Sequence, residues 1–341
     1  MDFIIAGKDR IEKSFLSGFE RLDVDVGKEN DFELQIPRSV SKKLAIEPGG
    51  FLFCPDTEYG GLITRVVAET SGDTTQWSGI TWRGLLELDI ITPPSGQDYR
   101  KASGEANAIL RTVLYENDAV GSLFTVPDTD SSIVFNNYQF GRYTDKLRGF
   151  SKMLLGENYR LQIRARQGGP NEVFSVSCEA VPVVDWSSEY EYSDDYQVSI
   201  SVSQDDGGIN HLICLGKGEL AARQRVDLYM QADGTVGASK YYSGFDERVA
   251  VFECSSGEGV AELAESGKER LLELANSKSL ALSVCDIDVD VGDIVGGRDR
   301  EFGIELAKPV ISKIVRIGNN QEEIELNVEG KQSDEDDDKE M

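Results

Sequence analysis

Three aspartates stand at alternate positions shortly before a glycine, which is the spacing with which a calcium-binding loop begins: Asp286, Asp288 and Asp290. An EF-hand loop also needs a glycine at its sixth position and a bidentate glutamate at its twelfth. Counted from the first aspartate, these positions hold Val291 and Gly297. Because isoleucine and valine fill the intervening positions, the stretch instead predicts a β-strand with one acidic face, which leads into a turn at Gly292.

Other residue combinations that could do chemistry are weak. Pairs of acidic residues suited to acid–base catalysis occur, for example Glu189 with Glu191 and Asp194 with Asp195, but a chain with 61 acidic residues produces such pairs by chance. The sequence contains no G-x-S-x-G motif and no complete phosphate-binding glycine loop. These patterns favour charged surfaces over catalytic carboxylates.

Histidine and cysteine give no metal pattern either. The chain has a single histidine, His211, which cannot supply a histidine-based zinc site. We predict a structural role for it. The five cysteines are far apart and include no C-x-x-C pair, so they predict reduced, buried thiols: Cys54, Cys178, Cys214, Cys254 and Cys285. We therefore predict no catalytic, no cofactor-binding and no metal-ligating residues.

The elements around these residues are mainly strands. In residues 22–26 and 32–36, apolar residues alternate with acidic or amide residues, and a strand over 75–82 precedes a short helix near 85–88. Short strands punctuated by glycine and proline predict a first β-barrel-like tube domain over residues 1–94, which later strands can complete.

Residues 95–184 have a different character. Apolar residues recur at helical spacing in 104–117 and 143–155, and residues 159–166 predict a strand with basic residues on one side. This stretch is predicted to be a mixed α/β inserted region.

Residues 185–330 predict a second β-rich, tube-type domain. It contains strands over 197–202, 211–215 and 223–230, a helix over 262–276, and closing strands over 280–291, 308–317 and 323–328. Residues 331–341 carry six acidic residues and two lysines and predict a disordered acidic tail. The predicted fold class is α+β, mainly β, with two barrel-like domains and a helix-bearing insertion.

The net charge is −26, and it is still −22 when the last eleven residues are left out. Such a field repels phosphate backbones, which argues against a nucleic-acid-binding module but not against a pore through which DNA slides. A plain solubility surface is the alternative. No apolar run is long enough to span a bilayer, and the first residues do not resemble a signal peptide, so synthesis in a cytoplasm is expected.

Four stretches, in this order, resemble the tail hub (baseplate hub) proteins of long-tailed phages, particularly the siphovirus type: 29–37 (ENDFELQIP), 61–66 (GLITRV), 78–91 (SGITWRGLLELDII), and 265–274 (ESGKERLLEL) with 291–295 (VGDIV). Order and spacing run across most of residues 20–330. The third stretch departs from the family, since Asp89 stands where an arginine is usual.

The resemblance implies a structural role. Hub proteins of this family form homotrimeric rings at the tip of the tail tube, with two barrel-like domains per chain. The implied partners are the tail tube protein, the distal tail protein, the tape-measure protein and a fibre or spike. DNA passes through the ring without specific binding, no membrane is involved, and the protein belongs to the virion after synthesis in the host cytoplasm.

Two other functions remain open. A tail-associated cell-wall hydrolase would need a cleft with paired carboxylates or a metal. A host-glycan-binding tail-tip adhesin would use exposed aromatic residues that stack on sugar rings, for which Trp186, Tyr190 and Tyr192 are candidates. The missing catalytic signatures favour the hub.

Overall fold

The computed structural model describes residues 1–68, 72–116, 122–169, 172–187, 199–205, 207–254, 259–275, 277–284, 289–299, 304–318 and 321–328. The chain divides into two compact units. Unit 1 comprises Met1–Ile200, Ala281–Arg298 and Ala307–Val328, and unit 2 comprises Ser201–Leu280, Asp299–Leu306 and Glu329–Met341.

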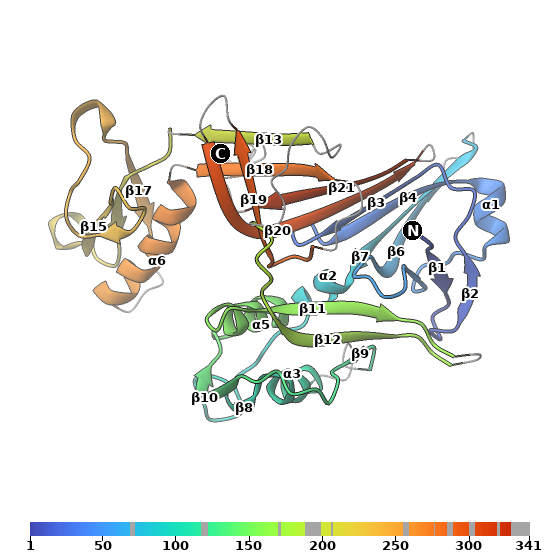
Figure 1. Cartoon of the computed structure of the whole chain (residues 1–341). Helices are drawn as coiled ribbons and strands as arrows, with labels where there is room; N and C mark the ends of the chain where they lie inside the picture. The colour runs from blue at the N-terminus through green and yellow to red at the C-terminus, as the bar shows by residue number, and fades with distance from the viewer. Residues whose placement is uncertain are drawn as a thin grey trace. The chain divides into compact units, whose positions relative to one another are not determined.

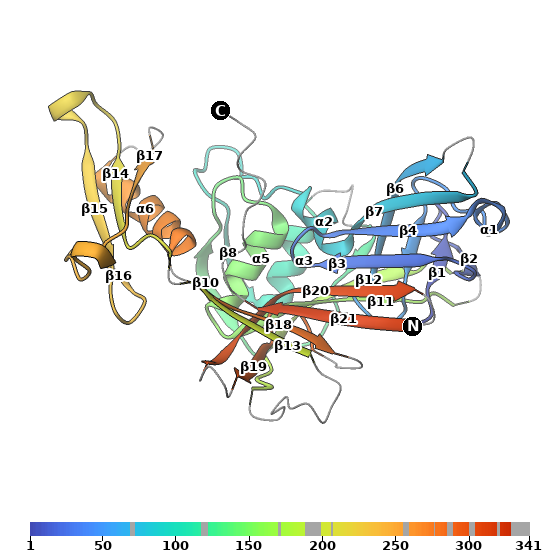
Figure 2. The same ribbon diagram turned by 90° about the horizontal axis from the view of Figure 1, so that it is seen from above.

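A 12-stranded sheet dominates unit 1 (Figures 1 and 2). Its strands follow the order β13 (Ser199–Asp205), β18 (Ser277–Val284), β21 (Gln321–Val328), β20 (Ile304–Gly318), β3 (Arg21–Val26), β4 (Asp31–Pro37), β7 (Thr74–Thr81), β6 (Gly60–Ala68), β5 (Phe51–Phe53), β1 (Ile4–Ala6) and β2 (Glu12–Phe15), with β19 (Ile294–Asp299) paired to β20. The centre of the sheet joins the two ends of the sequence, because β20 pairs antiparallel with β3. Late strands therefore complete the N-terminal sheet.

The alternation seen in the sequence sets the two faces of this sheet. On β3 and β4 every second residue is an aliphatic or aromatic side chain that is at least 99% buried: Leu22, Val24, Val26, Phe32, Leu34 and Ile36. The residues between them point to the opposite face, and the strand registers place six acids there together: Asp23, Asp25, Asp31, Glu33, Glu323 and Glu325. We call this the acidic sheet face. It also carries Arg21, Arg65 and Arg316.

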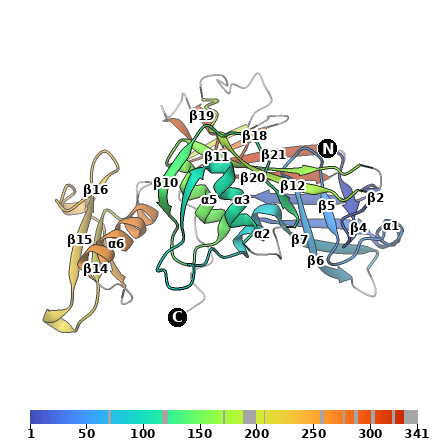
Figure 3. The same cartoon turned by 90° about the horizontal axis from the view of Figure 1, so that it is seen from below.

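The middle of the chain adds helices to the same unit. These are α1 (Arg38–Lys43), α2 (Trp82–Glu87), α3 (Ala106–Leu114) and α5 (Lys146–Leu155), with a ribbon of β8 (Lys101–Glu105) and β10 (Val134–Gln139) and a sheet of β11 (Tyr159–Arg166), β12 (Ser175–Pro182) and β9 (Phe124–Thr125). α3 and α5 lie against β12 and β11 (Figure 3). Their starts are capped, since the carboxylate of Asp145 accepts a hydrogen bond of 2.7 Å from the backbone N–H of Arg148.

One hydrophobic core joins the middle region to the N-terminal strands. The ring of Phe174 stacks on Phe53 with a centroid distance of 4.5 Å and meets Phe51 edge-on at 5.1 Å, and Phe51 stacks on Trp82 at 6.3 Å. Trp82 and Phe174 are fully buried. Buried aromatic contacts of this kind add to the burial of apolar area, so the middle region and the strands stabilise each other.

Unit 2 is a small α/β unit. Its sheet has the order β16 (Val236–Gly237), β15 (Arg225–Met230), β14 (His211–Leu215) and β17 (Val249–Glu253), and its loops contain the short 3₁₀ turns η2 (Leu220–Ala222) and η3 (Gly244–Asp246). Helix α6 (Val260–Leu274) covers one face of this sheet, where Leu212, Leu228 and Leu263 form the core (Figure 2). The packing is close at Gly267, because a Cβ there would lie 2.3 Å from Cys214 Sγ.

The predicted fold class is confirmed: the chain is a mainly-β α+β protein with few helices. The predicted helices over 104–117, 143–155 and 262–276 correspond to α3, α5 and α6. Strands β18 to β21, expected in a second barrel-like domain, continue the N-terminal sheet. The division into domains 1–94, 95–184 and 185–330 stays a prediction, and residues 331–341 lie outside the described residues.

The acidic strand predicted over 280–291 is partly wrong. Strand β18 ends at Val284, and Val289 and Asp290 lie in an irregular segment before the turn at Gly292. Asp290 is 93% buried and does not face solvent or a channel. Asp286 and Asp288 lie outside the described residues. The predicted turn and the strand that begins at Ile294 are confirmed.

Candidate functional site

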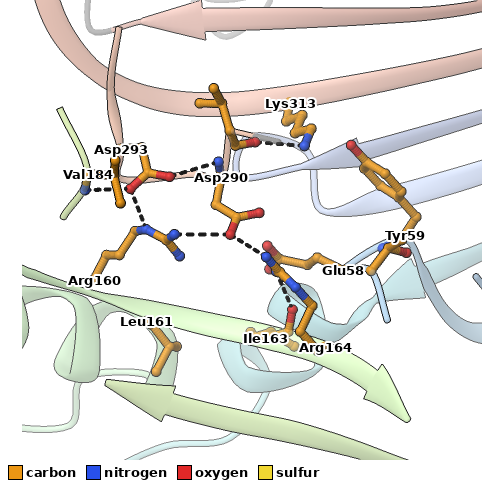
Figure 4. Close-up of polar contacts among 12 residues, drawn as sticks. Glu58, Tyr59, Arg160, Leu161, Ile163, Arg164, Val184, Asp290, Asp293 and Lys313 are labelled. Atoms are coloured by element: carbon orange, nitrogen blue, oxygen red, sulfur yellow. Dashed lines mark hydrogen bonds and ion pairs between the residues drawn. The ribbon is translucent and has the colours of Figure 1, made fainter. Parts of the chain in front are cut away.

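A cluster of buried charged residues in unit 1 brings together three segments that are far apart in the sequence (Figure 4). We call it the buried charge network and define it by five residues: Arg160, Arg164, Asp290, Asp293 and Lys313. Both arginines come from β11, the lysine comes from β20, and the aspartates lie in the connection that leads into β19. Four of the five residues are at most 9% exposed. The fifth, Arg164, has a side chain that is 13% exposed.

Local structure explains why these side chains meet. Residues two and four apart on a strand share a face, so Arg160 and Arg164 point to the same side of β11. The aspartates are held by a tight turn, in which the N–H of Asp293 donates to the carbonyl of Asp290 at 3.1 Å. Gly292 has a φ of +99°, and a Cβ on it would lie 2.9 Å from the Arg160 Cβ. Glycine therefore allows both the turn and the close approach of the arginine.

Each carboxylate accepts from more than one donor. Arg160 donates from Nε to Asp293 Oδ1 at 2.6 Å, and its Nη2 lies 3.1 Å from Asp290 Oδ2. Arg164 donates to the same Asp290 oxygen. Asp293 also accepts from the backbone N–H of Val184 at 2.9 Å and from that of Asp290 at 3.0 Å. Buried charges are tolerated when they are paired and hydrogen-bonded in this way.

Lys313 connects the network to the large sheet. Its Nζ donates to the backbone carbonyl of Val289 at 2.7 Å and lies 5.2 Å from the centroid of the Tyr59 ring. Beside it, Glu58 and Arg83 form a second buried ion pair at 2.5 Å, and Arg83 also donates to the carbonyl of Leu161 on β11 at 3.3 Å. The two groups of contacts attach β11 to both the N-terminal and the C-terminal strands.

Electrostatics favours the charged form of the central carboxylate. Burial alone would raise the pKa of Asp290, but the charge and hydrogen bond of Arg164 and the charges of Arg160 and Lys313 together lower it. Burial raises the pKa of Tyr59, so this phenol stays neutral. Asp290 is therefore held as a carboxylate beside the two arginines.

A pocket of about 390 Å³ opens beside the network. Its walls are lined by Met1, Val26, Asp56, Thr57, Glu58, Tyr59, Arg164, Asp290, Lys313, Glu322 and Ile324. The carboxylates of Asp290 and Glu58 already accept from arginines, and the Met1 ammonium pairs with Glu322 at 3.0 Å. These pairs hold segments from different parts of the chain together.

A further buried ion pair occupies the position where the sequence departs from the phage hub pattern. Asp89, at the end of α2, lies 2.7 Å from Lys146 Nζ at the start of α5, and both side chains are at least 96% buried. Lys146 also donates to the carbonyl of Leu114, the last residue of α3, at 2.9 Å. Asp89 thus helps to join three helices.

The remaining predicted positions can also be placed. Cys54, Cys178 and Cys214 are buried free thiols, as predicted, while Cys254 is half-buried. His211 is buried in unit 2, where its ring nitrogens lie 2.9 Å from Glu247 and 3.0 Å from Asp227 and its ring stacks on Tyr229. Cys285 and the residues Glu189, Tyr190, Glu191, Tyr192, Asp194 and Asp195 lie outside the described residues.

The described part of the chain has neither a cluster of metal ligands nor a helix that could span a membrane. No group of three or more histidine, cysteine, aspartate or glutamate residues in that part is arranged to hold a metal ion. None of its helices combines the length and the apolar character that crossing a membrane requires.

The sequence alone did not identify the network, although two signals for it were present. The sequence predicts the basic side of the 159–166 strand and the turn at Gly292 and Asp293. Nothing in either pattern says that the two meet, because Arg160 and Asp293 are 133 residues apart.

No known family model matches the chain, and no curated protein matches it. Solved structures do. The 43 kDa tail protein of prophage MuSo2 from Shewanella oneidensis superposes with a TM-score of 0.56 at 12% identity, covering 96% of this chain and 98% of that one. A tail protein from Neisseria meningitidis gives 0.52 at 12% identity, with 96% of each chain covered.

Prophage tail protein gp18 from Listeria monocytogenes gives a TM-score of 0.51 at 12% identity, covering 97% of this chain and 96% of that one. At this level of identity the likeness concerns the fold. The chain has the fold of these phage tail proteins over nearly its whole length.

Proposed function

We propose that the chain is a structural component of a phage tail, namely the hub that forms a ring at the tip of the tail tube. In this role it connects the tube and the distal tail protein to a spike or fibre and lets the DNA and the tape-measure protein pass. Its function is assembly through protein contacts and not catalysis. The ring is a homotrimer and belongs to the virion.

The observation that carries this proposal is the fold likeness over the whole length. Three solved structures named as tail proteins each align with at least 96% of this chain and at least 96% of their own. A likeness confined to one common sheet would say little, because the same fold can carry many functions. Here the likeness extends over nearly the whole length of both chains.

The acidic sheet face supports the second half of the proposal, the passage of DNA. Six acids and three arginines occupy it, so the face is negative overall. Burial raises the pKa of Asp31, and the neighbouring charges of Asp25, Glu29 and Glu33 raise it further, which is the effect of crowded like charges. A wall that is negative overall repels a phosphate backbone, because its acids outnumber its arginines.

The first test is the mass and shape of the purified chain, by light scattering together with negative-stain imaging. We expect a particle of three chains with a central hole. The second test labels the chain with an antibody on intact phage tails, where we expect the label at the tip. A chain that is absent from the tail, or is labelled along the tube, would contradict the proposal. So would cell-wall hydrolysis by the purified chain.

A further inference from the structure

In the described part of the chain, each unit has an edge strand that exposes apolar residues along a side paired with no other described strand. In unit 1, β6 pairs with β5 only through Gly60–Leu62, whereas its pairing with β7 continues to Ala68. Among the described residues, the part from Arg65 to Ala68 has β7 as its one strand neighbour. Val66 is 41% exposed and Val67 is 38% exposed, on opposite faces of the strand.

The second edge is β17 in unit 2. It pairs with β14 and ends the described sheet. Val249 and Val251 are 47% and 59% exposed on the face opposite α6, while Ala250 and Phe252 pack toward the helix. Native edge strands are usually protected by lysine, proline, bulges or inward charges. Neither the 65–68 part of β6 nor the 249–252 part of β17 contains a lysine, a proline or an acid, and the register shift of β6 lies before this part, between Ile63 and Arg65.

The two edges complement each other. We propose that β6 of one copy pairs antiparallel with β17 of the next copy, so that Arg65 lies opposite Glu253 and Val67 lies opposite Val251. Ala68 then lies opposite Ala250, and Val66 lies opposite Phe252. The inference rests on the proposed ring, for which it names the contact between subunits.

Charge selects this register. Arg65 is the one charged residue in the exposed part of β6, and Glu253 is the one charged residue of β17. The side chain of Glu253 is 66% exposed beside Arg223, so it can accept a second arginine. Opposite charges directly across a ladder are favourable, and a slip by two residues would place Arg65 opposite a valine instead.

The faces agree as well. Arg65 and Val67 lie on the acidic sheet face, because they pair with Ser78 and Gln76 on β7 and Ser78 pairs with Glu33 on β4. In the proposed pairing this face continues into the open face of the β17 sheet. The contact joins two different surfaces, and such a heterologous contact produces a ring when its rotation closes.

Cysteine cross-linking tests the pairing with the full chain, in a background where Cys254 and Cys285 are replaced by serine. Val67→Cys and Val251→Cys chains are purified separately, mixed and mildly oxidised. Directly opposite residues in a ladder come within the reach of a disulfide. We expect a band of twice the chain mass in the mixture and in neither chain alone. A mixture of Val66→Cys with Val251→Cys is the matched control and should show no cross-linked band, because Val66 points to the other face.

A charge exchange provides the second readout. Arg65→Glu places two acids opposite each other and should weaken association about fivefold. Adding Glu253→Arg should restore it. Both positions are exposed, so neither change should affect folding.

The outcomes separate this inference from the proposed function. Rings at the tail tip without the Val67–Val251 cross-link overturn the strand pairing and leave the hub intact. The cross-link in a chain that is absent from tails supports the pairing and contradicts the hub. A cross-link in the Val251→Cys chain alone would show that β17 pairs with β17 of another copy. A mixture that stays monomeric and without a cross-link at all concentrations would show that neither edge pairs. Either result overturns the inference.

Discussion

Replacing Asp290 by alanine should destabilise unit 1 more than removing any exposed acid. The substitution removes the carboxylate that Arg160 and Arg164 share in a site where Asp290 is 93% buried. Removing one member of a buried ion pair costs about 3 to 5 kcal/mol, since the remaining charge stays buried. We expect about 3 kcal/mol, at the lower end, because Arg160 keeps its hydrogen bond to Asp293.

Urea denaturation followed by tryptophan fluorescence measures this loss. All three tryptophans of the chain, Trp77, Trp82 and Trp186, lie in unit 1, so the signal reports on the unit that contains the network. The matched control is Asp56→Ala, which removes a surface pair whose side chains are 46% and 75% exposed. This control should lose less than about 1 kcal/mol. Equal losses in the two variants would refute the idea that the network holds the segments together.

We also predict that the stabilisation by Asp290 depends on pH. The folded state lowers the pKa of Asp290, because its arginine neighbours outweigh burial. A lowered carboxyl pKa contributes stability that is complete above the unfolded value of about 3.9 and is lost as the pH falls through the folded value. The advantage of the natural chain over Asp290→Asn should therefore be constant near neutral pH and shrink below about pH 4. A difference that grows on acidification would contradict the assignment.

Three further predictions concern other parts of the chain. Gly267→Ala should detach α6 from its sheet, because the new Cβ would lie 2.3 Å from Cys214 Sγ; limited proteolysis should then cut unit 2 while the tryptophan signal of unit 1 stays unchanged. Lys146→Met should cost about 3 to 5 kcal/mol by leaving Asp89 buried without this cation, and the double variant with Asp89→Leu should recover much of the loss in urea titrations. Asp31→Asn should stabilise the chain at neutral pH, because the folded state raises the pKa of that carboxyl. Denaturation at lower pH should show the gain vanish below the pKa of the unfolded state, where Asp31 is protonated in both the folded and the unfolded chain.

The strands and helices were largely predictable, because their patterns are local. Leu22, Val24 and Val26 alternate with acids at a period of two, and this period decides both the strand and its buried face. The helix predicted over 143–155 is also capped by a neighbouring residue, Asp145, so this signal is local too. Local patterns do not fix pairing partners, so the contact between β3 and β20 could not be derived.

The misplaced segment around Asp290 shows the limit most clearly. Alternating aspartate and valine has the same period whether the aspartates face water or face arginines. The deciding contacts come from Arg160 and Arg164, which are 133 and 126 residues away from their carboxylate partners. The sequence pattern therefore predicts an acidic strand, whereas the fold buries the acid at a turn.

The two groups of charges in unit 1 differ in a way that bears on function. In the buried charge network every carboxylate meets an arginine, and the pKa of Asp290 is lowered. On the acidic sheet face, burial raises the pKa of Asp25 and Asp31, so the folded chain is less stable at neutral pH than it would be with amides there. Asp25 also holds the turn after β3, because its carboxylate accepts hydrogen bonds of 3.2 and 3.1 Å from the backbone N–H groups of Lys28 and Glu29. Under the proposed function, a channel that must not retain a polyanion accounts for Asp31, and lysines in place of Asp31 and Glu33 should leave the ring assembled while slowing DNA release.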